Sequence, residues 1–552
     1  MDRADGGWWE AAVDAAGPGT DYAYFLDDED RALPDPRSAW QPQGVHGRSR
    51  ICDPGAFQWT DGGWQPPPLA SGILYEVHVG TFTREGTFDA ARGKLDALRD
   101  LGITHVELMP VNAFPGRQGW GYDGVDLFAP HEPYGGPEAL MRFVNACHEK
   151  GLAVLLDVVY NHLGPSGNYL SQFGPYFTDA HHTPWGDAVN LEDAGSHEVR
   201  RFFCDNALMW LRDYHFDGLR LDAVHAYIDR SAIHFMEQIA GEVHALEGQT
   251  GRHFVIIAES DLNDPRVVRA REAGGYGMDA QWSDDFHHAL VTVLTGDRSG
   301  YYADFGRLEQ LAKALREVFV YDGCYSAYRD RVHGAPVRGL PGWRFLGFSQ
   351  NHDQVGNRAK GERLCYLVSL GRAKIAAALE LTAPFVPMIF QGEEWAASSP
   401  FQYFTDHEAE LGKRISEGRK EEFAAFGWER KEVPDPQAAA TFERSKLNWE
   451  ERERASHAEM LAWYRQLIAL RKSRPELADG DLSRVEVRWS EEERWLAMER
   501  GGLTVAFSLA EQPVILETHG EARLLLASSG DVTLREGQLT LSRDSVAIAA
   551  TG

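Results

Sequence analysis

Residues 152–162 read LAVLLDVVYNH, and residues 218–225 read GLRLDAVH. Each stretch is a short apolar run that ends in polar side chains, which is the pattern of a strand buried on both faces. Between them, apolar residues recur at helical spacing from Val199 to Tyr214. A strand, a helix and a second strand of this kind predict a βαβ unit with parallel strands.

The same pattern extends in both directions along the chain. A predicted helix that begins at Pro137 and ends before Gly151 precedes the first stretch. Short apolar runs predict eight strands, at residues 73–79, 103–109, 152–159, 218–221, 254–258, 278–282, 345–349 and 386–390. Eight strand-then-helix units predict an α/β protein built on a (β/α)8 TIM barrel.

The two ends of the chain depart from this pattern. Residues 1–70 carry short aromatic runs between Gly, Pro and Asp clusters, and they predict a small N-terminal β-sandwich portion with a linker. Residues 71–480 contain the predicted barrel and a charged helical extension that starts near residue 406. Residues 481–552 alternate with a period of two and predict a C-terminal antiparallel β domain.

Composition limits the kind of ligand. The chain has 83 acidic and 55 basic residues, a formal net charge of −28. Such a chain repels phosphate backbones and anionic lipids, so we expect no nucleic-acid partner and no membrane role. The five cysteines are scattered without metal-ligand spacing, and the first ten residues lack the regions of a signal peptide. We therefore expect a cytoplasmic protein with no metal and no cofactor.

Carboxylates lie in or just after the ends of four predicted strands. They are Asp157, Asp222, Glu259 and Asp353. In a (β/α)8 barrel the active site lies at these C-terminal strand ends. Hydrolysis of a glycosidic bond needs one carboxyl at the anomeric carbon and another that protonates the leaving oxygen, while a third can bind sugar hydroxyls. Asp222, Glu259 and Asp353 fit these roles by number and position.

Two electrostatic expectations follow from this interpretation. Arg220 lies two residues before Asp222, on the same face of one strand, and would keep Asp222 ionised. Glu259 must hold a proton near neutral pH, so we expect its surroundings to raise its pKa.

Each of these residues also has a purely structural explanation. A lone Asp at a strand end is more often a turn or helix N-cap residue. Arg220 could belong to a structural ion pair, and His162, His225 and His352 could each be structural histidines. The recurrence of carboxylates at four strand ends of one barrel favours the catalytic interpretation.

Four segments resemble the signature regions of the α-amylase family of glycoside hydrolases. They are DVVYNH at 157–162, GLRLDAVH at 218–225, AES at 258–260 and SQNHDQ at 349–354. The resemblance covers about residues 73–552. It implies that Asp222 is the nucleophile, that Glu259 is the general acid/base and that Asp353 stabilises the transition state. It also implies substrate contacts from Tyr122, Asp157, Asn161, His162, Arg220, His225 and His352. Some members hold a structural calcium near the position of Asn161, but no further carboxylate cluster here demands one.

Other segments resemble one activity within that family. They are GWGYDGVDLFAPHEPYGGP at 119–137, QGEEW at 391–395 and FTDH at 404–407. They resemble members that hydrolyse the α-1,4 bond next to the terminal trehalose of malto-oligosyltrehalose. This implies a retaining reaction in trehalose biosynthesis and a functional pairing with the synthase that makes the trehalose end. Glu394, after the eighth strand, is a candidate contact to that end, with a surface or helix-cap Glu as the alternative.

Two alternatives stay open at this point. An α-glucan branching enzyme would use the same carboxylates but exclude water as the acceptor. A non-catalytic, amylase-like binding protein would typically lose a catalytic carboxylate, whereas all three remain here. The family's N-terminal sandwich is longer than residues 1–70, so we expect that domain to be incomplete.

Overall fold

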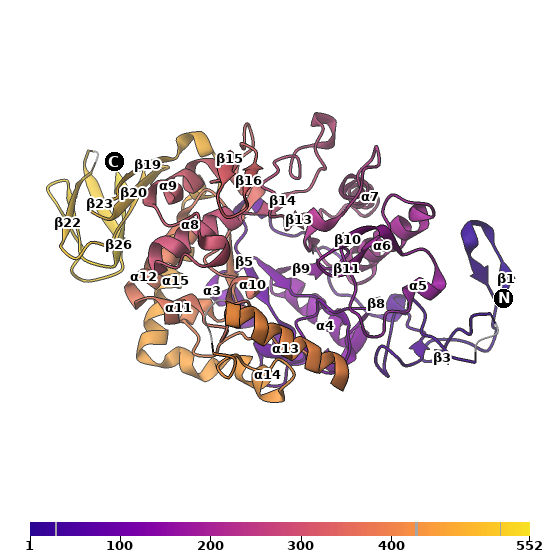
Figure 1. The fold of residues 1–552 in the computed structure, drawn as a ribbon. Coiled ribbons are helices and arrows are strands. Elements are labelled where there is room, and N and C mark those ends of the chain that lie inside the picture. Colours follow the sequence, from indigo (N-terminus) through magenta and orange to yellow (C-terminus); the bar gives the residue numbers. More distant parts are fainter. Residues whose placement is uncertain (28–29, 426–428, 519, 552) are drawn as a thin grey trace.

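The computed structural model describes residues 1–27, 30–425, 429–518 and 520–551, and Figure 1 shows the course of the chain. A closed barrel of eight strands lies at its centre, and neighbouring strands are parallel. Around the barrel the order is β5 (Leu74–Val77), β6 (His105–Leu108), β9 (Ala153–Val158), β12 (Gly218–Leu221), β13 (Val255–Ala258), β14 (Ala280–Trp282), β17 (Phe345–Gly347) and β18 (Val386–Phe390). All eight coincide with predicted strands, so the (β/α)8 prediction is confirmed.

Every residue of the eight barrel strands is buried, which explains their nearly continuous apolar runs. Charged residues interrupt these runs in register. Glu76 pairs with Glu107 on the adjacent strand, and Arg220 pairs with Asp157. Because buried charge is costly without partners, these four residues mark where the interior of the barrel becomes polar.

Helices form the outer layer. The principal ones are α3 (Leu95–Leu101), α4 (Gly136–Glu149), α6 (Ser196–Asp213), α7 (Phe235–Thr250), α8 (Asp284–Thr295), α9 (Leu308–Glu317) and α12 (Leu370–Thr382). The two helices predicted from spacing are α4 and α6. The apolar face of α6 is buried through Phe202, Phe203 and Trp210. The charged extension is helical as predicted, with α13 (Ala409–Ala425), α14 (Ala439–Ser445) and α15 (Ala455–Ser473).

The C-terminal residues form two antiparallel sheets, as predicted, at one end of the molecule (Figure 1). The first has the order β19 (Glu486–Ser490), β20 (Trp495–Arg500), β21 (Leu503–Ser508), β26 (Ser545–Thr551) and β23 (Ala522–Ala527). The second has the order β22 (Val514–Glu517), β25 (Gln538–Leu541) and β24 (Thr533–Arg535). Residues from both sheets, such as Ala506, Leu516 and Leu541, share one buried cluster.

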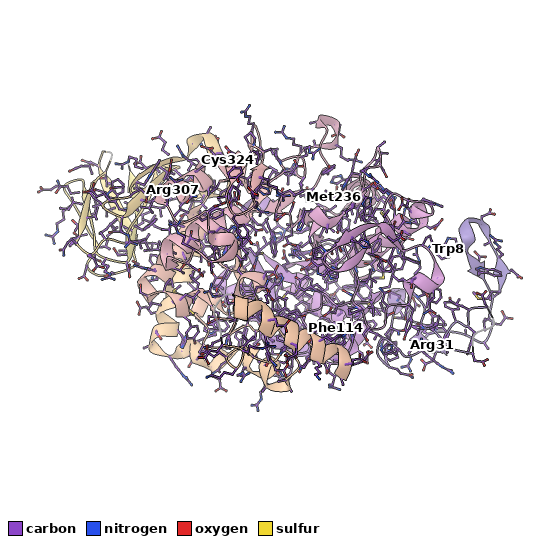
Figure 2. All side chains as sticks on the ribbon, viewed as in Figure 1. Trp8, Arg31, Phe114, Met236, Arg307 and Cys324 are labelled. Atoms are coloured by element: carbon purple, nitrogen blue, oxygen red, sulfur yellow. The ribbon has the colours of Figure 1, made fainter. Side chains whose placement is uncertain are left out.

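The N-terminal segment does not have the expected sandwich. Its described strands have two residues each and form two separate pairs: β1 (Asp2–Arg3) with β2 (Trp9–Glu10), and β3 (Asp21–Tyr22) with β4 (Ser49–Arg50). Figure 2 labels Trp8 on the hairpin that extends from this end. The indole N–H groups of Trp8, Trp40 and Trp64 donate to the carboxylates of Glu198, Glu132 and Asp217.

The segment therefore attaches to the flank of the barrel instead of forming a second sheet. Residues 66–68 are three prolines, which cannot donate to a strand ladder and which limit strand growth. The domain boundaries at residues 70 and 480 stay predictions. Within the described ranges, no helix has the length and apolar character needed to cross a membrane.

Candidate active site

The barrel brings the predicted polar residues to one end because its strands are parallel. Asp157 lies near the end of β9, Asp222 directly follows β12, and Glu259 directly follows β13. These three strands are neighbours in the barrel. Residues that are distant in sequence therefore lie beside each other at the C-terminal edge, as the strand pattern predicted.

Arg220 connects these three carboxylates. Its Nη1 donates to Asp157 Oδ2 at 2.7 Å and to Asp222 Oδ1 at 2.8 Å, and its Nη2 lies 3.1 Å from Glu259 Oε2. The side chain is 0% exposed, and the guanidinium lies 4.2 Å from the ring centroid of Trp282. A planar, always charged guanidinium can hold several carboxylate oxygens at fixed angles. Arg220 thus fixes the relative positions of three strand ends.

The turn after Asp222 orients Glu259. Ala223 has φ 40° and ψ 50°, in the left-handed region that a non-glycine residue seldom adopts. Its N–H donates to Glu259 Oε2 at 2.7 Å. Such a backbone conformation costs on the order of 1–3 kcal/mol and is found mainly at functional sites. The strain here aims a main-chain donor at a predicted catalytic carboxylate.

The start of α10 (His352–Gly356) contributes further residues to the site. Asn351 caps this helix, because its side-chain oxygen accepts from the backbone N–H of Gln354. His352 Nε2 lies 2.8 Å from Tyr122 Oη and 3.5 Å from Asp353 Oδ1.

The Tyr122 hydroxyl donates to Asp157 Oδ2 at 2.6 Å, and its ring stacks on the imidazole of His352 with centroids 5.1 Å apart. Hydrogen bonds therefore link the β17 end of the barrel to the group around Arg220.

Exposure separates two kinds of residue in this group. The side chains of Asp222, Glu259 and Asp353 are 11%, 16% and 37% exposed. Arg220 and Asp157 are 0% and 1% exposed. The three predicted catalytic carboxylates are therefore the ones that a ligand can reach, and the other two residues support them from below.

The pKa of Glu259 differs from our expectation. Burial raises it, but the charge of Arg220 and the N–H of Ala223 outweigh burial and hold the pKa of Glu259 below its ordinary value. The expected raised pKa is therefore wrong for this structure. The sequence contains no sign of the Ala223 donor.

The pKa of Asp222 shifts in the opposite direction, and this also differs from our expectation that Arg220 keeps Asp222 ionised. Burial raises its pKa well above the ordinary value in spite of Arg220, and the neighbouring Glu259, Asp157 and Asp353 raise it further. Arg220 alone therefore does not keep Asp222 ionised. The pKa values of the two carboxyls are thus shifted in opposite directions.

Three other predicted residues lie after β9 and β12. Asn161 is buried, and its side-chain amide has no hydrogen-bond partner within the described residues. His162 stacks on Trp185 with centroids 4.6 Å apart, and burial lowers its pKa to about 4, so the ring is neutral at pH 7. His225 Nδ1 lies 4.0 Å from Asp261 Oδ1, and its side chain is half-buried.

Glu394 is the predicted residue that the structure does not bring to this group. It lies in a short 3-10 turn after β18, and it is 1% exposed. Its carboxylate accepts from the hydroxyl of Tyr75, on β5, at 3.0 Å. Burial raises the pKa of Glu394 to about 7. A carboxylate placed in this way faces the wall of the barrel, so we do not retain it as a sugar contact.

Sequence reasoning missed two neighbours of the site. Glu76, on β5, binds His352 directly, with Nδ1 and Oε1 2.5 Å apart. The sequence could have indicated Glu76, because a charged residue inside a fully buried strand needs a partner. Trp185, 47% exposed beside His162, lies in a loop, and no sequence pattern pointed to it.

Among the residues that the structure describes, no cluster of three or more His, Cys, Asp or Glu side chains could hold a metal ion.

Comparisons with known proteins agree with this geometry. The family model described as "Alpha amylase, catalytic domain" matches residues 54–182, and one described as a domain of unknown function (DUF3459) matches residues 480–548. A malto-oligosyltrehalose trehalohydrolase of Rhizobium sp. (strain M-11) is 51% identical over 99% of this chain and 92% of its own length.

Two further comparisons bear on the fold and on the alternative activity. A crystal structure described as an alpha amylase from Salmonella typhimurium is 38% identical, with a TM-score of 0.89 over 98% of this chain and 92% of that one. A 1,4-alpha-glucan branching enzyme of Burkholderia thailandensis is 35% identical but matches 53% of this chain and 40% of its own length. The likeness to the branching enzyme is thus partial.

Proposed function

Because the chain belongs to the malto-oligosyltrehalose trehalohydrolase family of α-amylase-type glycoside hydrolases, we propose that it hydrolyses the α-1,4-glucosidic bond next to the terminal trehalose of malto-oligosyltrehalose. The products are trehalose and a shortened malto-oligosaccharide. The observation that supports this proposal most directly is the contact of Arg220 with Asp157, Asp222 and Glu259 at one end of the barrel.

The proposed reaction is a retaining double displacement. Asp222 attacks the anomeric carbon while Glu259 protonates the oxygen of the departing trehalose. The covalent malto-oligosyl–Asp222 intermediate is then hydrolysed by water, which loses a proton to Glu259 and releases the shortened malto-oligosaccharide. Asp353 accepts hydrogen bonds from the sugar hydroxyls as positive charge develops on the ring. Both carboxyl groups return to their starting states.

These roles need Asp222 ionised and Glu259 protonated. Without ligand, burial raises the pKa of Asp222, whereas Arg220 and the N–H of Ala223 lower the pKa of Glu259. We propose that the reactive complex carries its proton on Glu259, with Asp222 held ionised beside Arg220.

Product analysis tests the proposal. The purified protein is incubated with maltopentaosyl trehalose and, separately, with maltoheptaose and amylose. We expect free trehalose from the first substrate and little action on the others. New α-1,6 linkages in amylose, without trehalose, would instead assign branching activity. No product from any substrate would favour a binding protein.

The proposal includes a cellular setting. The trehalose-ended substrate must come from an enzyme that forms the terminal α,α-linkage, so we propose a functional pairing with a malto-oligosyltrehalose synthase. A cytoplasmic location fits the five unpaired cysteines, which stay reduced in that compartment.

A further inference from the structure

Glu76 makes two contacts with His352, and the mechanism above uses neither. Its Oε2 accepts from the backbone N–H of His352 at 3.0 Å, and its Oε1 lies 2.5 Å from Nδ1 of the ring. Both side chains are 1% exposed. Glu76 belongs to β5 and His352 to the segment after β17, so the contact joins two parts of the barrel that β18 separates.

Hydrogen-bond chemistry fixes the protonation of the His352 ring. A carboxylate accepts and does not donate, so Nδ1 carries a proton toward Glu76. The Tyr122 hydroxyl has one proton and gives it to Asp157, so it accepts from Nε2 of His352. Both ring nitrogens are therefore donors, and the ring is an imidazolium.

We propose that Glu76 is a positioning residue that fixes the ring of His352 and keeps it cationic, so that Asp353 beside it stays a carboxylate. This inference rests on the proposed hydrolase function. It adds to that function a charged pair, Glu76 and His352, that acts behind the three carboxylates and does not touch the sugar.

Several charged groups surround the ring of His352 and affect its pKa. Burial lowers the pKa of His352, but Glu76 and then Asp353 raise it, to about 9 overall, whereas Arg220 on β12 acts in the opposite direction.

Three carboxylates lie further along the network. Asp157 on β9 reaches the ring through Tyr122, and Glu107 on β6 and Glu259 after β13 each have a pKa that His352 lowers. Glu76 is the carboxylate that binds Nδ1. Burial raises the pKa of Asp353 overall, and His352 is the strongest of the groups that oppose this rise.

Glu107 offers a matched control. It is the register partner of Glu76 on β6 and equally buried. Neither of its carboxylate oxygens has a hydrogen-bond partner in the described part of the chain, and burial raises its pKa well above the ordinary value. Replacing Glu107 with Gln therefore changes an equally buried carboxyl that makes no hydrogen bond to His352.

The experiment compares pH profiles of kcat/KM for the wild type, Glu76→Gln and Glu107→Gln, with trehalose release from malto-oligosyltrehalose as the readout. Loss of the proton of the general acid Glu259 limits kcat/KM first. In the wild type we expect a further alkaline limb near pH 9, where His352 loses its proton. Loss of an adjacent opposite charge shifts a pKa by about 1–3 units. In Glu76→Gln the limb should move to lower pH by about that amount, and in Glu107→Gln it should stay in place.

Two further variants keep the test decisive. If Glu76→Gln does not fold, Glu76→Asp retains the charge at a greater distance and should move the limb in the same direction by less. In a His352→Gln background the limb near pH 9 should be absent, and adding Glu76→Gln should leave the profile unchanged, because the titrating group is already gone.

The outcomes separate this inference from the proposed function. An unmoved limb in the folded Glu76 variant, or an equal shift in Glu107→Gln, would overturn the role of Glu76. A wild-type protein that releases no trehalose would instead overturn the proposed function itself.

Discussion

Strand β12 has a buried aspartate at each end, and the two have opposite electrostatic character. Asp217 immediately precedes the strand, and Asp222 immediately follows it. The Asp217 carboxylate accepts from His148 Nε2 at 3.0 Å, Arg252 Nη2 at 3.1 Å and Trp64 Nε1 at 2.8 Å. Although burial raises its pKa, His148 and Arg252 lower it below the ordinary value overall.

Around Asp217 the positive groups match the carboxylates. Asp61 is the other carboxylate there, with Oδ2 2.8 Å from Nδ1 of both His148 and His215. Burial lowers the pKa of His148, but Asp217 and Asp61 outweigh it and raise the pKa overall. At the other end, Asp222 shares Arg220 with Asp157 and Glu259. The ratio of cations to carboxylates therefore distinguishes an end that stabilises the barrel from an end suited to chemistry.

The largest expected effect comes from removing the reactive carboxylate. Asp222→Asn should lower kcat for trehalose release by about 10⁴-fold or more, as loss of a nucleophile does in other hydrolases. Its melting temperature should stay level or rise, because the change removes one carboxylate from a crowded group. Steady-state kinetics and thermal unfolding measure the two effects, and near-normal turnover would contradict the assignment.

The converse change should affect stability and spare chemistry. Asp217→Asn leaves His148 and Arg252 without their shared carboxylate, and breaking a buried ion pair costs about 3–5 kcal/mol. We expect the free energy of unfolding in urea to fall by that amount, while kcat of the folded protein stays close to the wild-type value. A loss of kcat without loss of stability would contradict the assignment of a stabilising role to Asp217 and a catalytic role to Asp222.

The ion pairs around Asp217, at the start of β12, should make the stability of the protein depend on pH. Asp61 and Asp217 have lowered pKa values, so their contribution is present above the ordinary value of 3.8 and is lost as the pH falls. His148 has a raised pKa, so its contribution is present below 6.5 and is lost as the pH rises through the folded-state value.

The network should therefore contribute most between about pH 4 and 6.5. Urea unfolding at a series of pH values should show a flatter profile for Asp217→Asn. An identical profile in the variant would mean that other groups set the pH dependence.

The smallest effect concerns the N-terminal segment. Trp64→Phe keeps a ring stacked over His148, where the indole centroid now lies 4.7 Å away, but it removes the N–H donor to Asp217. A hydrogen bond to a charged group contributes about 1.5–3 kcal/mol, and we expect a loss of unfolding free energy at the lower limit of that range. Chemical unfolding measures it, and kcat should not change. A loss as large as that of Asp217→Asn would show that the indole, not the ion pairs, holds this end together.

Much of the site could be predicted because its residues lie at fixed places along periodic segments. Asp222 and Glu259 directly follow buried apolar strands, and parallel strands bring such positions together. The lowered pKa of Glu259 could not be predicted, because it depends on the approach of Arg220 and on the N–H of Ala223 in a left-handed turn. Glu394 also follows a strand, yet the turn after β18 directs it to Tyr75.

The sequence by itself determined the elements with regular spacing. These are the eight buried strands, the amphipathic helices, the C-terminal sheets and the carboxylates at strand ends, since periodicity and strand position are local properties. Only the tertiary structure decided in which direction the pKa of each carboxyl shifts, which partner binds His352 and what the first 70 residues pack against. Those outcomes depend on side chains and main-chain donors from other elements, and desolvation makes each contact strong enough to reverse a pKa.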